Sequence, residues 1–294
     1  MKAGFVSLVG LPNAGKSTLL NRLVGTKLAI VSDKPQTTRT RILGVRTYPE
    51  GQVVYVDTPG VHRPTHRMNV RMLDTARDAM RDVDVVGVVV DASQKPGTGQ
   101  AHLLEMVRHV TAPVVLVLNK VDLLAKMKLL PIIDRLSHER EFADIVPVSA
   151  LGGTNVERLE QVFLSHLPEG EALYPEDYLT DQPERFFVAE LVREQVLQHT
   201  HAELPFSTAV VVDKFEEPER EKGLLKLYCT ILVERESQKP IVIGRRGEMI
   251  KQIGTAARLE LERFFDTKVY LDLHVKVKSE WREDERVLDE IFNR

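Results

Sequence analysis

A glycine-rich segment near the start of the chain restricts the folds open to it. Residues 9–18 read VGLPNAGKST, and from Gly10 to Ser17 they follow the pattern G-x-x-x-x-G-K-S. An apolar run precedes the pattern and a stretch with helical spacing follows it, so the segment predicts a loop between a strand and a helix. In such a loop, backbone N–H groups converge on phosphate oxygens, a lysine adds positive charge, and a serine hydroxyl can bind Mg²⁺. The segment therefore favours a nucleoside triphosphate site over a ligand-free strand–helix turn.

The rest of the first half alternates between strand-like and helix-like stretches. Short apolar runs that are typical of buried strands occur at 4–10, 53–57, 84–91, 113–119 and 145–150. Amphipathic stretches of helical length lie between most of them, at 16–24, 100–110, 127–139 and 155–167. Continuous rather than alternating hydrophobicity predicts strands that are covered on both faces. We therefore expect an α/β domain with a mostly parallel sheet, helices on both faces, and ligands at the carboxyl ends of the strands.

Length and composition limit the class of protein. A chain of 294 residues predicts about two domains, and 43% hydrophobic with 28% charged residues is ordinary for a globular protein. The longest apolar runs fall short of the roughly 18 residues that a membrane span needs. We expect the apolar start to be a first strand rather than a signal peptide. The single cysteine, Cys229, excludes an internal disulfide, favours a reducing compartment, and is expected to be buried in a strand.

Three further motifs at strand ends indicate which nucleotide binds. In DTPG (57–60), Asp57 can join the Mg²⁺ shell and the Gly60 N–H can meet a γ-phosphate. In NKVD (119–122), the Asp122 carboxylate can accept both N–H groups of a guanine edge, which adenine does not offer. The SAL segment (149–151) can complete the base pocket. The residues predicted to bind GTP are Gly10, Leu11, Pro12, Asn13, Ala14, Gly15, Lys16, Ser17, Thr18, Asp57, Thr58, Pro59, Gly60, Val61, Asn119, Lys120, Val121, Asp122, Ser149, Ala150 and Leu151.

With these motifs, residues 1–167 resemble the GTPase domain of translation-factor-like GTPases. The segment DKPQTTRTR (33–41) resembles the first switch of the Era family in particular. The resemblance implies that Thr38 gives its hydroxyl to Mg²⁺ when the γ-phosphate is present, with Thr37 as the alternative. The implied metal ligands are Ser17, Thr38 and Asp57, and the implied catalytic residues are Lys16, Thr38, Gly60 and Asn13. A solvated polar loop is the competing interpretation of this segment.

One position departs from the small signalling GTPases. They place a water-orienting glutamine directly after the DxxG glycine, whereas this chain has Val61. Valine cannot orient water, so we expect slow intrinsic hydrolysis unless another group positions the nucleophile. The resemblance implies that Asn13 accompanies a potassium ion beside the β- and γ-phosphates. The alternative is an asparagine that only shapes the loop.

The βα pattern stops at a segment rich in proline, glycine and acidic residues. We expect a GTPase domain at 1–167, a linker at 168–183 and a second domain at 184–294. The second domain is predicted to be α+β, with helices at 186–200 and 247–265. Its predicted strands lie at 207–217, 224–235 and 268–278.

The segment IVIGRRGEMIKQIG (241–254) carries the functional signal of the second domain. A G-x-x-G pair is weak alone, since the glycine content predicts about one by chance. Here the pair holds two arginines and precedes an amphipathic helix, which resembles a type II KH domain. KH domains clamp about four nucleotides of single-stranded RNA at this loop. The residues predicted to bind RNA are Lys239, Ile243, Gly244, Arg245, Arg246, Gly247 and Lys251; the alternative is an ordinary helix-start turn.

The charge of the second domain argues against a broad RNA-binding surface. Residues 184–294 contain 19 lysines and arginines against 22 acidic residues. Residues 239–258 reverse this balance, with five basic residues and one acidic residue. We therefore expect a small basic groove for one short strand. Trp281 starts an acidic helical segment, where packing is favoured over base stacking.

A GTPase domain followed by one KH domain resembles the architecture of the Era family. The resemblance implies a GTP-hydrolysing switch that binds 16S rRNA near its 3′ end, uses GTP/GDP and Mg²⁺, and acts in small-subunit assembly. It also implies a cytoplasmic monomer, with peripheral association at the inner face of the cell membrane left open. One competing class is a membrane-surface or protein-partner GTPase, which the missing polybasic amphipathic helix disfavours. Another is a nucleic-acid-modifying enzyme, for which no cysteine nucleophile or second cofactor motif is visible.

Overall fold

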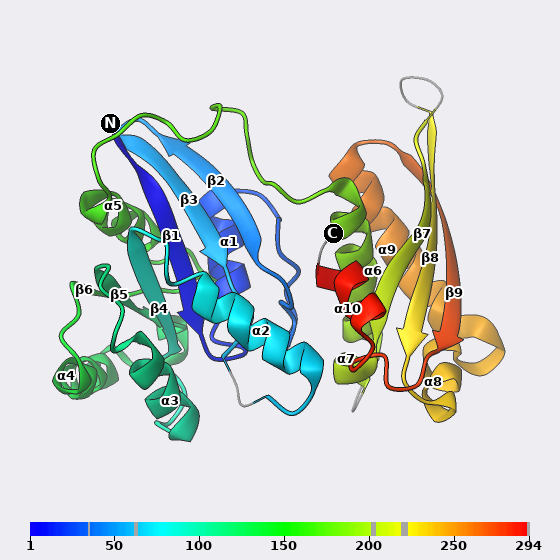
Figure 1. The fold of residues 1–294 in the computed structure, drawn as a ribbon, viewed down its shortest axis with the longest axis horizontal. Helices are drawn as coiled ribbons and strands as arrows, with labels where there is room; N and C mark the ends of the chain where they lie inside the picture. Colours follow the sequence, from blue (N-terminus) through cyan, green and yellow to red (C-terminus); the bar gives the residue numbers. More distant parts are fainter. Residues whose placement is uncertain (35, 62–63, 201–203, 219–222, 293–294) are drawn as a thin grey trace. The chain divides into compact units, whose positions relative to one another are not determined.

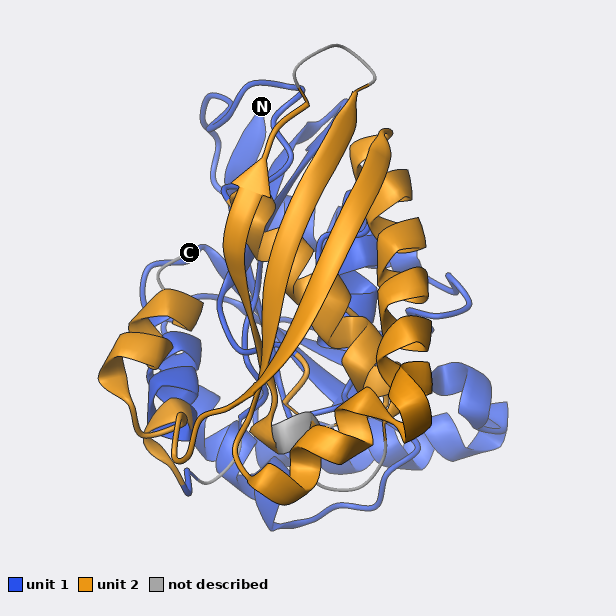
Figure 2. Ribbon diagram, turned by 90° about the vertical axis from the view of Figure 1, so that its right-hand side faces the viewer, with its two compact units in different colours: residues 1–29, 38–65, 69–181 blue, residues 30–37, 66–68, 182–294 orange. Residues whose placement is uncertain are grey.

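The structure, a computed structural model, describes residues 1–34, 36–61, 64–200, 204–218 and 223–292. The chain divides into two compact units (Figure 2). Unit 1 comprises Met1–Ala29, Thr38–Thr65 and Asn69–Asp181. Unit 2 comprises Ile30–Thr37, His66–Met68 and Gln182–Arg294. The segment 30–37, which includes much of the expected first switch, thus belongs to unit 2; Pro35 within it lies outside the described residues.

Unit 1 is built on one six-stranded sheet (Figure 1). Its strands, in spatial order, are β2 (Ile42–Tyr48), β3 (Gly51–Asp57), β1 (Lys2–Gly10), β4 (Val85–Asp91), β5 (Val114–Asn119) and β6 (Asp144–Pro147). All neighbouring pairs are parallel except β2 and β3, which are antiparallel. The strands β1, β3, β4 and β5 are buried along almost their whole length, as their continuous apolar runs predict. The predicted mostly parallel sheet is confirmed.

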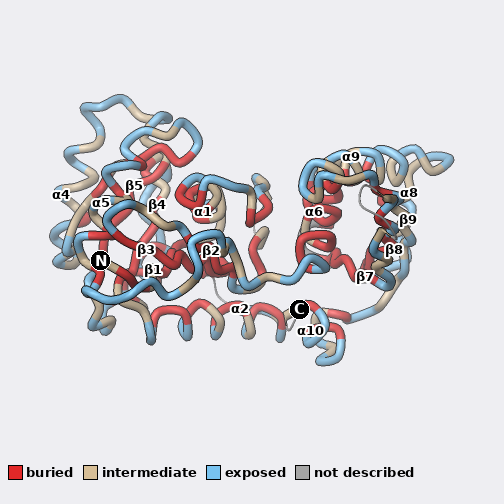
Figure 3. Tube along the Cα trace, turned by 90° about the horizontal axis from the view of Figure 1, so that it is seen from above, coloured by how far each residue is buried: buried red, intermediate tan, exposed pale blue. Residues whose placement is uncertain are grey.

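Helices cover both faces of this sheet. They are α1 (Lys16–Val24), α2 (Arg67–Asp78), α3 (Thr98–Val107), α4 (Leu129–Glu139) and α5 (Val156–His166), with 3₁₀ turns η1 (Val121–Leu123) and η2 (Lys126–Lys128). One apolar core joins the side chains of α2, α3 and α4 to Val86 and Val88 of β4. Gly87 of the same strand faces the opposite side of the sheet, where a Cβ atom would lie 3.0 Å from the Phe163 ring of α5. Figure 3 shows the buried strands between exposed helix surfaces. Edge strand β2 and the polar helix α2 were not predicted from the sequence.

The segment expected as a linker lies along the edge strand of unit 1. The Val45 N–H donates to the Leu179 carbonyl at 2.8 Å, and the Thr180 hydroxyl donates to the Leu43 carbonyl at 2.6 Å. The rings of Tyr174 and Tyr178 stack 4.7 Å apart. These contacts partner the free edge of β2, which otherwise exposes unpaired backbone groups. Residues 168–181 therefore cluster with unit 1.

Unit 2 follows the predicted order of a helix, two strands, a helix and a strand, with short helices added between and after these elements. Its elements are α6 (Glu184–His199), α7 (Leu204–Ser207), β7 (Ala209–Glu216), β8 (Leu224–Val233), η3 (Glu236–Gln238), α8 (Lys239–Ile243), η4 (Arg245–Gly247), α9 (Glu248–Phe265), β9 (Lys268–Val277) and α10 (Glu285–Phe292). The sheet order is β7-β8-β9, antiparallel and then parallel. Apolar residues of α6 and α9 form one core with the inner face of the sheet, where Cys229 is fully buried.

Trp281 is part of the structural framework of unit 2. Its side chain is fully buried, and its indole N–H donates to the Ser207 carbonyl at 2.9 Å. A buried and hydrogen-bonded indole has no face for a nucleotide base, so packing rather than stacking is its role. None of the described helices combines the length and apolar composition needed to span a bilayer.

Candidate functional site

The glycine-rich loop between β1 and α1 is shaped by its own conformational needs. Gly15 takes the left-handed conformation with φ of 93°. A Cβ atom at Gly15 would lie 2.2 Å from the Asn119 amide nitrogen, so only glycine fits here. Asn13 also has a positive φ of 62°, which asparagine tolerates better than most residues. The loop therefore wraps tightly where backbone N–H groups are expected to surround phosphate.

Lys16 occupies the first position of α1, inside this loop. Its ammonium donates to the carbonyl of Gly10 at 3.2 Å and to that of Leu11 at 3.1 Å. Burial lowers the pKa of the ammonium, and the nearby Asp57 carboxylate partly opposes that shift. The ammonium is thus held against the loop and away from solvent. In this position it can form a charge-assisted hydrogen bond to a phosphate bound in the loop.

Three oxygen-bearing side chains meet beside Lys16. The Ser17 hydroxyl lies 2.6 Å from the Thr38 hydroxyl and 2.7 Å from Oδ2 of Asp57, and the Thr38 hydroxyl lies 3.3 Å from the same oxygen. Oδ1 of the buried Asp57 has no hydrogen-bond partner among the described residues. One carboxylate and two hydroxyls suit Mg²⁺, which prefers oxygen ligands and few protein groups. The arrangement fits a magnesium ion.

The neighbouring Thr37 is already engaged elsewhere. Its hydroxyl donates to the Lys34 carbonyl at 2.7 Å. Of the two threonines that the sequence offered, the structure brings Thr38 to Ser17 and Asp57 and ties Thr37 to its own loop. This geometry supports Thr38 as the metal ligand.

The DTPG segment packs directly against the phosphate loop. A Cβ atom at Gly60 would lie 2.7 Å from the Pro12 nitrogen, so glycine allows the two segments to touch. The Thr58 hydroxyl donates to the Leu8 carbonyl at 2.9 Å, and Pro59 is buried. Val61 donates its N–H to Gly10 at 3.1 Å, and its side chain is buried in the core. This valine thus has neither the chemistry nor the position to orient water.

Asn119 links the phosphate loop to the base end of the site. Its amide nitrogen donates to the Ala14 carbonyl at 2.8 Å, and its amide oxygen accepts from the Ala150 N–H at 2.9 Å. The side chain is buried. Since one side chain bridges two loops, it sets the distance between the phosphate and base contacts.

At the end of the site where a base would bind, some groups are held by hydrogen bonds or an ion pair, and others are exposed to solvent. The Lys120 ammonium pairs with Asp91 at 2.7 Å, and the Val121 N–H donates to Val148 at 3.2 Å. The Ser149 hydroxyl accepts from the Gly152 N–H at 2.9 Å. Asp122 is exposed on η1, and Leu151 is 75% exposed. Asp122 and Leu151 are therefore accessible to a base, while the residues around them hold the pocket.

Two residues of this site were missed from the sequence. Arg22, in the last turn of α1, donates to the carbonyls of Ala150 and Leu151 and so holds the base loop. Asp91 ends β4 and fixes Lys120. The position of Asp91 at a strand's carboxyl end was an available signal, whereas Arg22 looked like an ordinary helix-end charge.

The GxxG loop of unit 2 uses its two glycines differently. Gly244 has a φ of 75°, and a Cβ there would lie 2.5 Å from the Met249 Cβ. Gly247 has a φ of 82°, yet a Cβ there would meet no atom of the described residues within 4 Å. Gly244 thus packs the loop against α9, while Gly247 leaves open space where RNA phosphate can approach backbone. Arg245 and Arg246 are exposed beside it.

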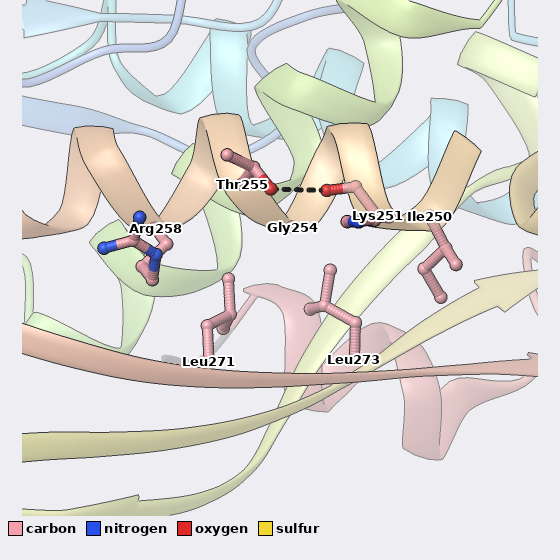
Figure 4. Close-up of a pocket in the computed structure, with 7 residues that line it drawn as sticks. All are labelled: Ile250, Lys251, Gly254, Thr255, Arg258, Leu271 and Leu273. Carbon is pink, nitrogen blue, oxygen red and sulfur yellow. Dashed lines mark hydrogen bonds between the residues drawn. The ribbon is translucent and has the colours of Figure 1, made fainter. Parts of the chain in front are cut away.

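A groove of about 320 Å³ lies between the first half of α9 and strand β9 (Figure 4). Its walls are formed by Ile250, Lys251, Gly254, Thr255 and Arg258 of α9 and by Leu271 and Leu273 of β9. Ile250, Leu271 and Leu273 make part of this lining apolar. Lys251 adds positive charge, while the Arg258 guanidinium is paired with Glu262 at 2.9 Å. The GxxG loop leads directly into α9, the helix that forms one wall of the groove, and this arrangement suits a short nucleic acid strand.

Of the predicted RNA-binding residues, Lys251 lines this groove and Gly244 to Gly247 form the adjoining loop. Lys239 and Ile243 lie on α8 and are not among the groove's lining residues. The apolar lining from Ile250, Leu271 and Leu273 was not predicted from the sequence. Their spacing matched an ordinary amphipathic helix and strand, so only the fold distinguishes them.

Both units match known protein families. The family of 50S ribosome-binding GTPases matches residues 5–120, and the KH domain family matches residues 203–282. GTPase Era of Geotalea uraniireducens (strain Rf4) is 50% identical over 289 residues, covering 98% of this chain and 97% of the relative. GTPase Era of Geobacter metallireducens is 48% identical over 290 residues, covering 99% and 97%.

Solved structures agree with these matches. Era in complex with MgGDPNP and nucleotides 1506–1542 of 16S ribosomal RNA gives a TM-score of 0.95 at 39% identity, covering 99% of this chain and 98% of that chain. A variant of Aquifex aeolicus Era bound to GDP·AlF4⁻ gives a TM-score of 0.93 at 39% identity, covering 99% of each chain. The similarity extends over both units.

Proposed function

Because this chain belongs to the Era family of GTPases, we propose that it is a GTP-hydrolysing switch that binds 16S rRNA near its 3′ end and acts in small-subunit assembly. The observation that carries the proposal is the pairing, in one chain, of a magnesium–nucleotide site with an open GxxG loop and groove. The functional division into a GTPase domain at 1–167, a linker at 168–183 and an RNA-binding domain at 184–294 is part of the proposal.

The nucleotide site supplies positioning and charge for phosphoryl transfer. Lys16 would meet the β- and γ-phosphates of a bound nucleotide, Ser17, Thr38 and Asp57 would hold the metal, and the Gly60 N–H would meet the γ-phosphate. Bound Mg²⁺ neutralises charge that develops on the phosphate oxygens. Since Val61 is buried, no side chain directly after Gly60 orients water. This arrangement supports slow intrinsic hydrolysis, and Asn13 with potassium is the proposed assistance.

The choice of guanine depends on Asp122. Its exposed carboxylate stands on η1, next to the pocket that Lys120, Ser149 and Arg22 hold in place. Two charge-assisted hydrogen bonds to the guanine edge would favour GTP over ATP.

The RNA target comes from the structural neighbour. Era of similar fold is known in complex with nucleotides 1506–1542 of 16S ribosomal RNA, and the match covers 99% of this chain and 98% of that chain. This chain carries a GxxG loop beside a groove. The description of the GTPase family names the 50S particle, but it covers residues 5–120 only. We therefore propose the small subunit as the site of action, in the cytoplasm, with peripheral membrane association secondary.

The competing function, a GTPase whose second domain serves a membrane or a protein, is not favoured. The KH domain match and the open Gly247 face both point to RNA. In our proposal, GTP with Mg²⁺ orders the two switch segments at 33–41 and 57–66, and this ordering changes how the domains dock; residues 35, 62 and 63 lie outside the described structure.

Crosslinking tests the proposal directly. The protein, loaded with a non-hydrolysable GTP analogue, is crosslinked to RNA in a lysate, and the bound RNA is sequenced. We expect enrichment of the 3′ end of 16S rRNA, and loss of that enrichment in Gly247→Asp. Equal recovery of unrelated RNAs by both proteins would contradict the RNA target.

A further inference from the structure

The segment before Thr38 is anchored in the core of unit 2. Residues 30–37 belong to unit 2, although they follow α1 of unit 1 in sequence. Ile30 is 3% exposed and shares a buried apolar cluster with Val188 and Val192 of α6. The start of the first-switch region is therefore fixed by hydrophobic packing against this helix.

Two adjacent buried charges of α6 hold the backbone of this segment. The Glu194 carboxylate accepts the Val31 N–H at 2.9 Å, and the Arg193 guanidinium donates to the Thr37 carbonyl. Arg193 and Glu194 are each only 2% exposed. Charged groups are rarely buried so fully unless they have partners, and here their partners include backbone groups at the two ends of one loop.

The Arg193 guanidinium is itself held in one orientation. Its Nε donates to one carboxylate oxygen of Glu190 at 2.8 Å, and a terminal nitrogen donates to the other at 2.5 Å. Such a two-point pair fixes the plane of the guanidinium. Lysine cannot reproduce this fork, so the geometry calls for arginine.

The position of Thr38 follows from this contact through the covalent chain. The Thr37 carbonyl and the Thr38 N–H belong to one planar peptide group, so a donor that fixes the carbonyl also orients the start of Thr38. One residue further, the Thr38 hydroxyl lies 2.6 Å from the Ser17 hydroxyl. The chain passes from unit 2 to unit 1 at this peptide bond.

We propose that Arg193, supported by Glu190, is a positioning residue for the GTPase reaction that sets the Thr38 hydroxyl at the magnesium site. This inference rests on the proposed function, because it takes Thr38 as a metal ligand. By thermodynamic reciprocity, a metal and γ-phosphate that fix Thr38 also stabilise the contact at α6, the first helix of the RNA-binding domain. The peptide bond between Thr37 and Thr38 is thus a direct route for coupling.

A double-mutant cycle tests this role. GTP hydrolysis is measured against Mg²⁺ concentration for the wild type, Arg193→Gln, Thr38→Ala and the double variant. Arg193→Gln should raise the half-saturating Mg²⁺ concentration at least tenfold, since small misplacements of reacting groups cost this much or more. In the Thr38→Ala background, the same change should add less than about twofold. GDP affinity measured without Mg²⁺ should stay unchanged.

Matched variants separate positioning from damage to the fold. Arg185→Gln removes an arginine of the same helix that also donates to a carbonyl, that of Val212 at 3.0 Å, and should leave Mg²⁺ dependence unchanged. Emission of Trp281, the single tryptophan, reports whether unit 2 is folded. If Arg193→Gln does not fold, the cycle is run with Arg193→Lys, which keeps the charge and should show a smaller increase of the same kind.

The outcomes distinguish the inference from the function on which it rests. Independent effects of Arg193→Gln and Thr38→Ala that multiply in the double variant would overturn the positioning role. A Thr38→Ala variant with wild-type Mg²⁺ dependence would instead overturn Thr38 as a ligand in the proposed function.

Discussion

The two sites of this molecule are built to receive phosphate in opposite ways. In unit 1, the loop is closed around itself: a Cβ at Gly15 or Gly60 would lie 2.2 or 2.7 Å from neighbouring atoms, and Lys16 is buried. In unit 2, Gly247 faces open space, with exposed arginines beside it. The closed site suits a compact ligand held by many fixed donors, and the open site suits a strand that extends past the protein.

Because of this difference, substitutions at the two sites should have effects of different size and extent. In the closed site, many side chains hold one another, so a change at one position spreads to the others. In the open site, a substitution meets ligand before it meets protein. We therefore expect larger but less separable effects in unit 1, and smaller but cleaner effects in unit 2.

The largest effect is expected from Lys16→Ala in the closed site. Loss of a buried cation at the transferring phosphate should lower the GTP hydrolysis rate by about 100-fold or more. Steady-state phosphate release measures it, with Lys126→Ala, an exposed lysine of η2, as control. Hydrolysis at the original rate by folded Lys16→Ala would remove the assignment.

Asp122→Asn tests base recognition at the exposed end of the nucleotide site. The substitution exchanges an acceptor for a donor and should weaken GTP binding by about tenfold to a hundredfold, while improving xanthosine triphosphate binding. Competition against labelled GTP measures the affinities for GTP and xanthosine triphosphate. Asp134→Asn, at an exposed position on α4, is the control. Equal loss of both nucleotides would contradict the base-reading role.

Gly247→Asp tests the open site. A carboxylate against RNA phosphate should weaken single-stranded RNA binding at least tenfold, about 1.4 kcal/mol, without changing the GTP affinity of the free protein. Gly247→Ala, which adds only a Cβ at a φ of 82°, separates backbone strain from charge and should cost less. Arg245→Ala should weaken RNA binding less and flatten its salt dependence, as loss of one phosphate contact requires. Unchanged RNA affinity in folded Gly247→Asp would make this loop an ordinary helix start.

A smaller effect is expected from the monovalent ion at Asn13. Replacing potassium by sodium should slow hydrolysis by the wild type several-fold, because a positive charge beside the phosphates is lost. Asn13→Ala should respond little to the exchange. Parallel rate measurements in the two salts decide the matter, and identical responses of the two proteins would exclude potassium assistance through Asn13.

The smallest effect concerns the stability of unit 1. Burial raises the pKa of the Glu160 carboxyl above its ordinary value, while a hydrogen bond from Tyr48 partly offsets this. The stability contribution of Glu160 is therefore complete below its unfolded pKa and is lost as the pH rises through the raised folded pKa. Glu160→Gln should gain stability relative to the wild type as the pH rises above the ordinary pKa of a glutamate. Denaturant unfolding of both proteins at a series of pH values measures this difference. Tyr48→Phe removes the hydrogen bond to Glu160 and should enlarge the loss of stability that occurs as the pH rises. A stability difference between Glu160→Gln and the wild type that does not change with pH would contradict the raised pKa of Glu160.

The sequence predicted the closed site better than the open one for a physical reason. Phosphate loops need particular residues at fixed spacing, so Gly10 to Ser17, Asp57 and Asp122 were recognisable without a structure. The groove in unit 2 uses Ile250, Leu271 and Leu273, which any amphipathic helix and strand supply. Strand β2 was missed because it is an edge strand whose last residues are exposed or half-buried, and helix α2 was missed because it is largely polar.

The contacts of Arg193 and Glu194 could not have been predicted from the sequence at all. Both lie on a helix that supplies much of the core of unit 2, and each also bonds a backbone group more than 150 positions away. Such pairings depend on where two distant segments meet, which local patterns do not encode.

One measurement tests whether the nucleotide site of unit 1 and the RNA site of unit 2 are coupled. A labelled RNA that carries the single-stranded 3′ end of 16S rRNA is titrated with the protein bound to Mg²⁺ and a non-hydrolysable GTP analogue, and with the protein bound to GDP. We expect RNA binding to be at least tenfold tighter in the GTP-analogue state, and we expect Thr38→Ala to abolish this difference. Equal RNA affinity of the wild type in the two nucleotide states would contradict this coupling.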